Sequence, residues 1–250
     1  MRSVNRYMGK ADLHIHTALS DGMGTISAVL EAASRTDLDI IAITDHDRVD
    51  GALEAVDLAP RYGISVIPGA EITTAEGHLV ALYINRPIPP RLPLHDTVLR
   101  VAEQGGLCIV AHPMAPFLNS IKAPNLIWAL ADPLVAGTLV GLEVYNGGLP
   151  QLANNRRALV LGEKTGLAQV ASSDSHLLWT IGMWATEFPG SSPADLRLAL
   201  ELRLTQPVIA DRPFRFFTSW ARGLLLRRAG IAYWSPEPRG GVMLRRLSSI

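Results

Sequence analysis

The stretch Ala11-Asp12-Leu13-His14-Ile15-His16 is a short apolar run that carries two histidines at its end. Side chains two residues apart on a β-strand project from the same face. We therefore expect His14 and His16 to point together into the interior of the sheet that this strand joins. Imidazole pairs of this kind are typical metal ligands, so the run predicts a metal site as well as a strand.

Similar runs recur along the chain, and several of them also end in a histidine or a carboxylate. The strand candidates are residues 11–15, 40–44, 65–67, 79–84, 107–111, 142–145 and 167–171. Helical spacing separates several of them, as at residues 26–33, where Thr25 is the expected N-cap. Strands that alternate with helices indicate parallel βα units. In a closed βα barrel the active site lies at the C-terminal ends of the strands, where these polar residues fall.

Two segments depart from this pattern. His78 opens its run, which is the wrong end of a parallel strand, so we expect that strand to run antiparallel or to be irregular. The proline-punctuated segment Pro113–Gly141 is expected to form a long loop over the site, with a helical turn near residues 126–130.

The composition narrows the class of protein. The 250 residues are 48% hydrophobic, which suits one barrel-sized domain, and 23 basic and 23 acidic side chains give no net charge. A neutral chain gives no strong nucleic-acid signal, so we expect a small substrate. Cys108 is the only cysteine, which excludes an internal disulfide. No secretory signal or apolar run of roughly 18 residues is evident, so we expect a cytoplasmic location.

The C-terminal segment differs in charge from the rest. Residues 212–250 contain eight arginines and one acidic residue, Glu237. We predict a barrel domain over residues 1–210 and a short basic extension over residues 211–250 that packs on the barrel. A weak contact with a membrane or a subunit is the alternative for this extension, and the sequence leaves the oligomeric state open.

Eight motifs in order carry a family resemblance. They are Asp12-Leu13-His14-Ile15-His16-Thr17, Ser20-Asp21-Gly22, Thr44-Asp45-His46-Asp47, Pro68-Gly69-Ala70-Glu71, Gly77-His78-Leu79, Ala111-His112-Pro113, Glu143-Val144-Tyr145-Asn146 and Ser173-Asp174-Ser175-His176. Over about residues 11–205 the chain resembles the polymerase and histidinol phosphatase (PHP) superfamily of metal-dependent phosphoesterases. The resemblance implies a distorted (β/α)7 TIM-like barrel. It also implies two or three divalent ions, with zinc, manganese or iron as the metal.

The resemblance also assigns the metal ligands. The first ion would be held by His14, His16, Glu71 and Asp174, the second by Glu71, His78 and His112, and the third by Asp21, His46 and His176. Glu71 would bridge the first two ions. A hydroxide that bridges the metals would attack phosphorus, because metals lower the pKa of bound water.

Other residues are candidates for supporting roles. Asp45 and Glu143 are expected to orient the imidazoles, and Asn146 to donate a hydrogen bond to the substrate. Arg156, preferred over Arg157, would bind phosphate, although solvated helix charges are the alternative for both. For proton transfer to the leaving group, the candidates are His176 and a metal-bound water.

Three functions remain open on the sequence. The first is a phosphoesterase that acts on a small phosphorylated metabolite or nucleotide, as a monoester or a diester. The second is a metal-dependent hydrolase of a carbamate, ester or amide bond. The third is a non-catalytic PHP regulatory module, which is disfavoured because every expected ligand is present.

Overall fold

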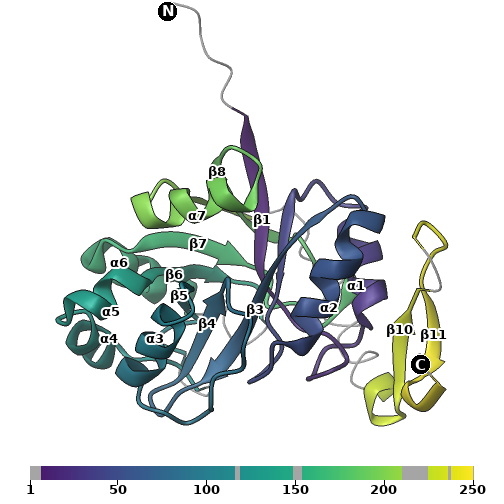
Figure 1. Ribbon diagram of the computed structural model, residues 1–250, viewed down its shortest axis with the longest axis horizontal. Coiled ribbons are helices and arrows are strands. Elements are labelled where there is room, and N and C mark those ends of the chain that lie inside the picture. The colour runs from purple at the N-terminus through teal and green to yellow at the C-terminus, as the bar shows by residue number, and fades with distance from the viewer. Residues whose placement is uncertain (1–6, 116–118, 149–153, 210–224, 236–237, 250) are drawn as a thin grey trace, which may run out of the picture.

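The computed structural model describes residues 7–115, 119–148, 154–209, 225–235 and 238–249. Within these ranges the chain is an α/β protein whose curved sheet forms a nearly closed barrel, with helices along its outer side (Figure 1). The strands of this sheet are β1 Met8–Ile15, β2 Ile40–Ile43, β3 Ser65–Thr73, β4 His78–Leu82, β5 Leu107–Val110, β6 Leu139–Asn146, β7 Ala168–Ser172, β8 Trp184–Pro189 and β9 Gln206–Ile209.

The sheet is mixed, in the order β7-β6-β5-β4-β3-β2-β1-β8-β9. Strand β4 runs antiparallel to both of its neighbours, which confirms one of the two alternatives for the strand that His78 opens. The chain after β7 returns to the end of β1, where the amide of His16 donates to the carbonyl oxygen of Ser175 at 2.9 Å. This pairing nearly closes the barrel, as expected for the TIM-like class.

The seven predicted strands correspond to β1–β7, but β8 and β9 were not predicted. Strand β8 reads Trp-Ala-Thr-Glu-Phe-Pro and pairs antiparallel with β1, while β9 is a four-residue edge strand. The mixed polar and apolar residues of β8 and the shortness of β9 give weak strand signals. The pairing of β8 with β1 also joins distant parts of the chain.

Alternate strand residues separate two apolar layers. Ile40 and Ala42 of β2 belong to an inner cluster to which each of strands β1–β8 contributes, whereas Ile41 and Ile43 pack in an outer cluster against the helices. Ala11 and Leu13 of β1 also face inward, but Ile15 faces outward. The register with β2 shifts between Asp12 and Ile15, which reverses the alternation.

This irregularity in β1 positions the site. Strict alternation would place His14 and His16 on the face opposite to Leu13. One extra residue in the strand re-aims the side chains that follow it, as β-bulges commonly do beside active sites. A second register shift occurs in β6, between Glu143 and Tyr145. The two strands that contribute His14 and Glu143 are therefore both irregular where these residues lie.

The helices are α1 Ile26–Ala33, α2 Asp50–Leu58, α3 Leu94–Ala102, α4 Ala123–Ala129, α5 Pro133–Thr138, α6 Asn155–Thr165 and α7 Pro193–Leu202. Thr25 caps α1 as predicted, since its hydroxyl accepts from the amide of Ala28. The predicted loop over residues 113–141 is interrupted by the short helices α4 and α5, and the helical turn predicted near residues 126–130 corresponds to α4. Pro133 lies in the first turn of α5, where its missing amide hydrogen costs nothing, and Asp132 caps that helix.

A C-terminal hairpin lies beside α1 (Figure 1). Its strands are β10 Ile231–Trp234 and β11 Met243–Arg246. The backbone of Tyr233 pairs with the chain just before α1, at 2.7 Å to Met23 and 2.8 Å to Thr25. The predicted boundary at residues 210 and 211, with Arg212, Arg215 and Arg222, lies outside the described residues, so the division into two domains stays a prediction.

None of the helices in the described part of the chain has the length and apolar character that a membrane crossing requires.

Candidate metal centre

The histidines and carboxylates predicted as ligands gather at one edge of the sheet. His14 lies near the C-terminal end of β1, and Glu71 lies in β3 opposite Val80 of β4. His78 is the first residue of β4, and because that strand is antiparallel its start lies at the same edge, paired with Thr73. The reversed strand thus brings His78 to the other ligands.

One oxygen of the Glu71 carboxylate faces three imidazoles. Glu71 Oε2 lies 3.3 Å from Nε2 of His14, 3.3 Å from Nε2 of His16 and 3.1 Å from Nδ1 of His46. Asp174 Oδ1 adds a second carboxylate, 3.4 Å from Nε2 of His16 and 3.7 Å from Nε2 of His14. These atoms form a compact set of nitrogen and oxygen donors.

The other oxygen of Glu71 faces two different imidazoles. Glu71 Oε1 lies 2.8 Å from Nδ1 of His78 and 3.0 Å from Nε2 of His112. The side chain of Glu71 is only 1% exposed, so its two oxygens separate two groups of buried or partly buried rings. This is the arrangement that a carboxylate bridging two ions requires.

A third group surrounds Asp21. Its Oδ1 lies 3.3 Å from Nδ1 of His16, and its Oδ2 lies 3.0 Å from Nε2 of His176 and 3.6 Å from Nε2 of His46. His16 and His46 each use their second ring nitrogen toward Glu71. The structure therefore brings all the predicted ligands together in one continuous cluster.

Burial varies across this cluster. The buried members are His14, His16, Glu71 and His112. The side chains of His46, His176 and Asp21 are 30%, 34% and 39% exposed. A molecule that arrives from solvent meets the Asp21 group first.

Glu143 supports the buried end of the cluster. Its Oε1 lies 2.9 Å from Nδ1 of His14, and its Oε2 accepts from the amide of His112 at 2.7 Å and from Nδ2 of Asn146 at 2.8 Å. Glu143 thus contacts an imidazole, as the sequence suggested. Asn146 is buried, and its Oδ1 accepts from the amide of Gly148, so both ends of its amide group are engaged. The hydrogen bond from Asn146 to substrate stays a prediction.

Two aspartates hold the loops that carry ligands. Asp45 accepts hydrogen bonds from the amide and hydroxyl of Thr17 and from the hydroxyl of Ser20, and it contacts no imidazole among the described residues. Its effect on His16 therefore passes through the loop, which differs from the predicted direct contact. Asp12, which sequence reasoning did not assign, accepts from the amides of Ser173 and Gly182 at 3.0 and 2.9 Å.

The protonation pattern fits a cation. Burial opposes protonation of His14, but the charges of Asp174, Glu71 and Glu143 outweigh it and raise the pKa of the ring well above its ordinary value. Nδ1 of His14 faces Glu143, and its Nε2 faces Glu71. That Nε2 also lies 3.1 Å from Nε2 of His16. Burial opposes protonation of His16, but hydrogen bonds to Asp174 and Glu71 outweigh it and raise its pKa to about 10. The cluster attracts positive charge, and a divalent cation between these donors would satisfy it without the extra proton.

His112 directs one of its two ring nitrogens toward the cluster. Nδ1 of His112 is buried and has no hydrogen-bond partner among the described residues, although its Nε2 faces Glu71. Buried polar atoms without partners are uncommon in proteins. The set of donors contains imidazole nitrogens and carboxylate oxygens without sulfur, which is the chemistry of zinc, manganese and iron sites.

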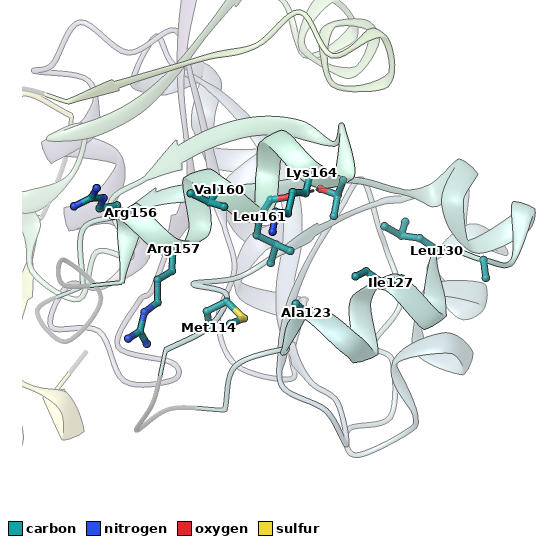
Figure 2. A pocket seen from close by; sticks show the side chains of 11 residues that line it. Met114, Ala123, Ile127, Leu130, Arg156, Arg157, Val160, Leu161 and Lys164 are labelled. Atoms are coloured by element: carbon teal, nitrogen blue, oxygen red, sulfur yellow. Dashed lines mark hydrogen bonds between the residues drawn. The ribbon is translucent and has the colours of Figure 1, made fainter.

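Arg156 and Arg157 lie apart from this cluster. Both are exposed in the first turn of α6, and neither side chain forms an ion pair or hydrogen bond with another described residue. Their side chains line a groove against α4 (Figure 2). No ligand side chain of the cluster lines that groove.

Comparison with known proteins gives the family. Residues 12–123 match the PHP domain, and residues 153–203 match the PHP-associated family. An uncharacterized protein of Methanocaldococcus jannaschii is 34% identical over 148 residues, which are 55% of this chain and 81% of that protein. A 5'-3' exoribonuclease of Haemophilus influenzae is 36% identical over 235 residues, which cover 87% of this chain and 74% of the relative.

A solved structure shows the same fold. It is a two-domain protein of Bacteroides vulgatus that contains a predicted PHP-like metal-dependent phosphoesterase, with a TM-score of 0.69 and 22% identity. The similarity covers 96% of this chain and 75% of that one. With eight ordered motifs, a clustered ligand set and these relatives, the chain belongs to the PHP superfamily.

Proposed function

We propose that this protein is a metal-dependent phosphoesterase that hydrolyses a small phosphorylated metabolite or nucleotide. The single observation that carries the proposal is the division of five imidazoles between the two oxygens of one buried carboxylate, Glu71. That division supports a pair of metal ions, and two-metal sites are common catalysts of phosphoester hydrolysis. The Haemophilus influenzae relative is named an exoribonuclease, which supports a phosphodiester between nucleotides as the bond that is cleaved.

The ligand roles follow the geometry. His14, His16, Glu71 and Asp174 would hold one ion; Glu71, His78 and His112 would hold a second; Asp21, His46 and His176 would hold a third. When bound, such ions lower the pKa of water and neutralise charge on phosphoryl oxygens. Hydrolysis forms a bond from water oxygen to phosphorus and breaks the bond to the leaving oxygen, which takes up a proton.

The protein's own residues prepare this step. Glu143 fixes the ring of His14 and the backbone of His112, and Asn146 in turn holds Glu143. Asp45 fixes the loop that follows His16. Such supporting contacts keep ligands in place, and their loss commonly costs 10–100-fold in metal affinity or activity.

His176 is the residue we propose for proton delivery in a centre of two ions. Its Nδ1 lies 2.9 Å from the carbonyl oxygen of Asp174, so that nitrogen carries a proton and Nε2 is the exchangeable atom. Nε2 faces Asp21 at the exposed side of the cluster. Binding a third ion and delivering a proton from this nitrogen are mutually exclusive, so the number of ions decides its role.

The test is metal analysis combined with a substrate panel. Protein purified without chelators should contain about two or more ions per chain. It should hydrolyse p-nitrophenyl phosphate, its diester or nucleoside monophosphates in preference to a carboxylic ester. Glu71→Gln should lose metal and more than about 100-fold of the turnover together, because it removes a shared ligand rather than a support. Glu103→Gln, an exposed carboxylate elsewhere, is the control.

The outcomes separate the alternatives. A metallated protein that cleaves only the carboxylic ester would contradict the proposal and favour the C–O or C–N hydrolase. Fewer than about one ion per chain would favour a non-catalytic module. A fully metallated and active Glu71→Gln variant would contradict the bridging role.

A further inference from the structure

The C-terminal hairpin lies beside α1 (Figure 1) and pairs with the loop that precedes that helix. We refer to residues 16–25 as the Asp21 loop, because it carries the exposed ligand candidate Asp21. The amide of Tyr233 in β10 donates to the carbonyl oxygen of Met23 at 2.7 Å, and the amide of Thr25 donates to the carbonyl oxygen of Tyr233 at 2.8 Å. Strand β10 therefore pairs with the part of the loop that follows Asp21.

A helical turn at residues 225–228, just before the hairpin, contacts the same loop on the other side of Asp21. Nη2 of Arg227 donates to the carbonyl oxygen of Ser20 at 2.7 Å, across 207 positions of the sequence. Ser20 directly precedes Asp21. The C-terminal segment is thus hydrogen-bonded to the loop both before and after the ligand candidate.

The hairpin also contacts the segment that follows His176. The ring of Tyr233 meets the ring of Trp179 edge to face, with 6.2 Å between their centroids. Trp179 lies in the short 3-10 helix Leu178–Thr180, which begins two residues after His176. The amide of Met23 donates to the carbonyl oxygen of His176 at 2.9 Å. The hairpin therefore packs against both segments that supply the exposed ligands Asp21 and His176.

A barrel residue supports the same loop in a similar way. Nη1 of Arg48 donates to the carbonyl oxygen of Leu19 at 2.8 Å, and the guanidinium also bonds to the carboxylate of Asp50. Arg227 is partly buried and forms no ion pair with another described residue. Two guanidinium groups, one from the barrel and one from the C-terminal segment, thus hold the consecutive carbonyl oxygens of Leu19 and Ser20.

The position of this loop decides the geometry of the Asp21 group. Asp21 Oδ2 lies 3.0 Å from Nε2 of His176 and 3.6 Å from Nε2 of His46. Asp21 lies in a turn rather than on a strand, so the contacts of the loop must hold its backbone. Functional constellations need their residues held within roughly 0.5 Å of the productive geometry. Loss of a contact at Ser20 should therefore be felt at the carboxylate of Asp21.

We propose that Arg227 and the C-terminal hairpin position the Asp21 loop and thereby raise the affinity of the Asp21 group for its metal ion. The proposal rests on the ligand roles given under the proposed function, and it extends the metal centre to a segment that supplies none of the proposed ligands. Arg227 would be a positioning residue, because it acts through Ser20 and Asp21. The ions at Glu71 should depend little on it, since buried residues of the barrel surround that carboxylate.

The loop is tested first in the metal-free protein by hydrogen–deuterium exchange. Arg227→Gln removes the charged donor to Ser20 but keeps a long polar side chain. The amides of Gly22 and Met23, which are hydrogen-bonded in the structure, should exchange about tenfold faster, as expected for one lost charged hydrogen bond. Arg228→Gln is the matched control, because Arg228 is exposed and its side chain forms no hydrogen bond or ion pair with another described residue.

Ion binding is tested by titration with Mn²⁺, followed by electron paramagnetic resonance, which needs no turnover. Asp21→Asn identifies the exposed ion, because it weakens a ligand of that ion alone. Arg227→Gln should weaken the same ion by about tenfold and leave the other ions unchanged. Arg227→Lys, which keeps a charged donor, should restore part of the affinity, and Arg228→Gln should bind as the wild type does.

A double substitution tests whether Arg227 acts through Asp21. In the Asp21→Asn background the exposed ion is already lost, so the addition of Arg227→Gln should change the affinity for the remaining ions by less than about twofold. Residues that act through one another show this kind of non-additivity. A large further loss of the remaining ions would show that Arg227 stabilises the whole protein, and would overturn the proposal.

The other failures are distinguishable. A wild type with fewer than about one ion per chain would contradict the proposed function itself. Normal ion binding whose affinities are all unchanged by Arg227→Gln would overturn the positioning role alone, whatever the exchange of the loop shows. A higher KM for Arg227→Gln with unchanged ion affinities would also overturn it, because Arg227 would then contact the substrate.

Discussion

The metal centre and the groove between α4 and α6 differ in how their polar side chains are held. At the centre, Glu143 fixes His14 and Asn146 fixes Glu143, so buried side chains hold one another. In the groove, Arg156 and Lys164 are exposed and have no partner in the described part of the chain. The side chains of the centre are thus held in place by one another, whereas the described cations of the groove are not held by other side chains.

The largest effect is expected from a substitution that loosens the metal centre without removing a ligand. Glu143→Gln keeps the size of the side chain but removes the charge that favours a proton on Nδ1 of His14. We expect a loss of 10–100-fold in metal affinity or turnover. Competition with a chelator and steady-state kinetics measure the two quantities. Unchanged metal affinity and unchanged turnover would show that the buried partners do not hold the ligands.

A smaller effect on turnover is expected from Asn146, which contacts Glu143 rather than a metal ligand. Asn146→Ala removes the donor to Glu143 while leaving the His14 contact in place. We expect about a tenfold fall in turnover, at the lower end of the range for supporting residues. KM should stay constant at saturating metal, because Asn146 is buried and its amide is engaged. A large increase in KM with normal turnover would instead support the role in substrate binding predicted from the sequence.

The smallest effect concerns the outer helices beside the groove. His95 lies on α3, and its Nε2 is 2.8 Å from Oδ2 of Asp132, the cap of α5. Asp132 and then Asp96 raise the pKa of His95 above its ordinary value of 6.5. The stabilisation is therefore full below the unfolded pKa and is lost as pH rises through the folded pKa.

His95→Gln should consequently lower the unfolding midpoint slightly near pH 5.5 and leave it unchanged near pH 9. Chemical denaturation at the two pH values measures this difference. Metal content should be the same as in the wild type, because His95 lies outside the centre. A change in metal content would show that the contact between α3 and α5 affects the metal centre, which would contradict this expectation.

The sequence predicted the centre better than its surroundings. The positions of His14, His16 and Glu71 follow from short motifs at strand ends, which are local in the chain. The register shift that turns His14 inward after Leu13 was not predictable, since it depends on how β1 pairs with β2. Strand β8 was missed for the same reason, because its partner β1 is distant in sequence.

The roles of the supporting residues were also beyond the sequence. Asp45 adjoins His46 in sequence, which suggested a direct contact with imidazole, yet it bonds to Thr17 across 28 positions. The Asp12 carboxylate was not assigned because its partners, Ser173 and Gly182, are 161 and 170 positions away in the sequence. Burial raises the pKa of Asp12 to about 6. Hydrogen bonds between residues so distant in sequence depend on the tertiary fold and cannot be predicted from local motifs.

The proposed function depends on Glu71 acting as a ligand of two metal ions. Anomalous diffraction from crystals grown with Mn²⁺ tests it most directly. We expect one ion peak on the Oε2 side of Glu71, near His14 and His16, and a second on the Oε1 side, near His78 and His112. A catalytically active protein with a single peak, or with peaks that do not contact Glu71, would contradict it.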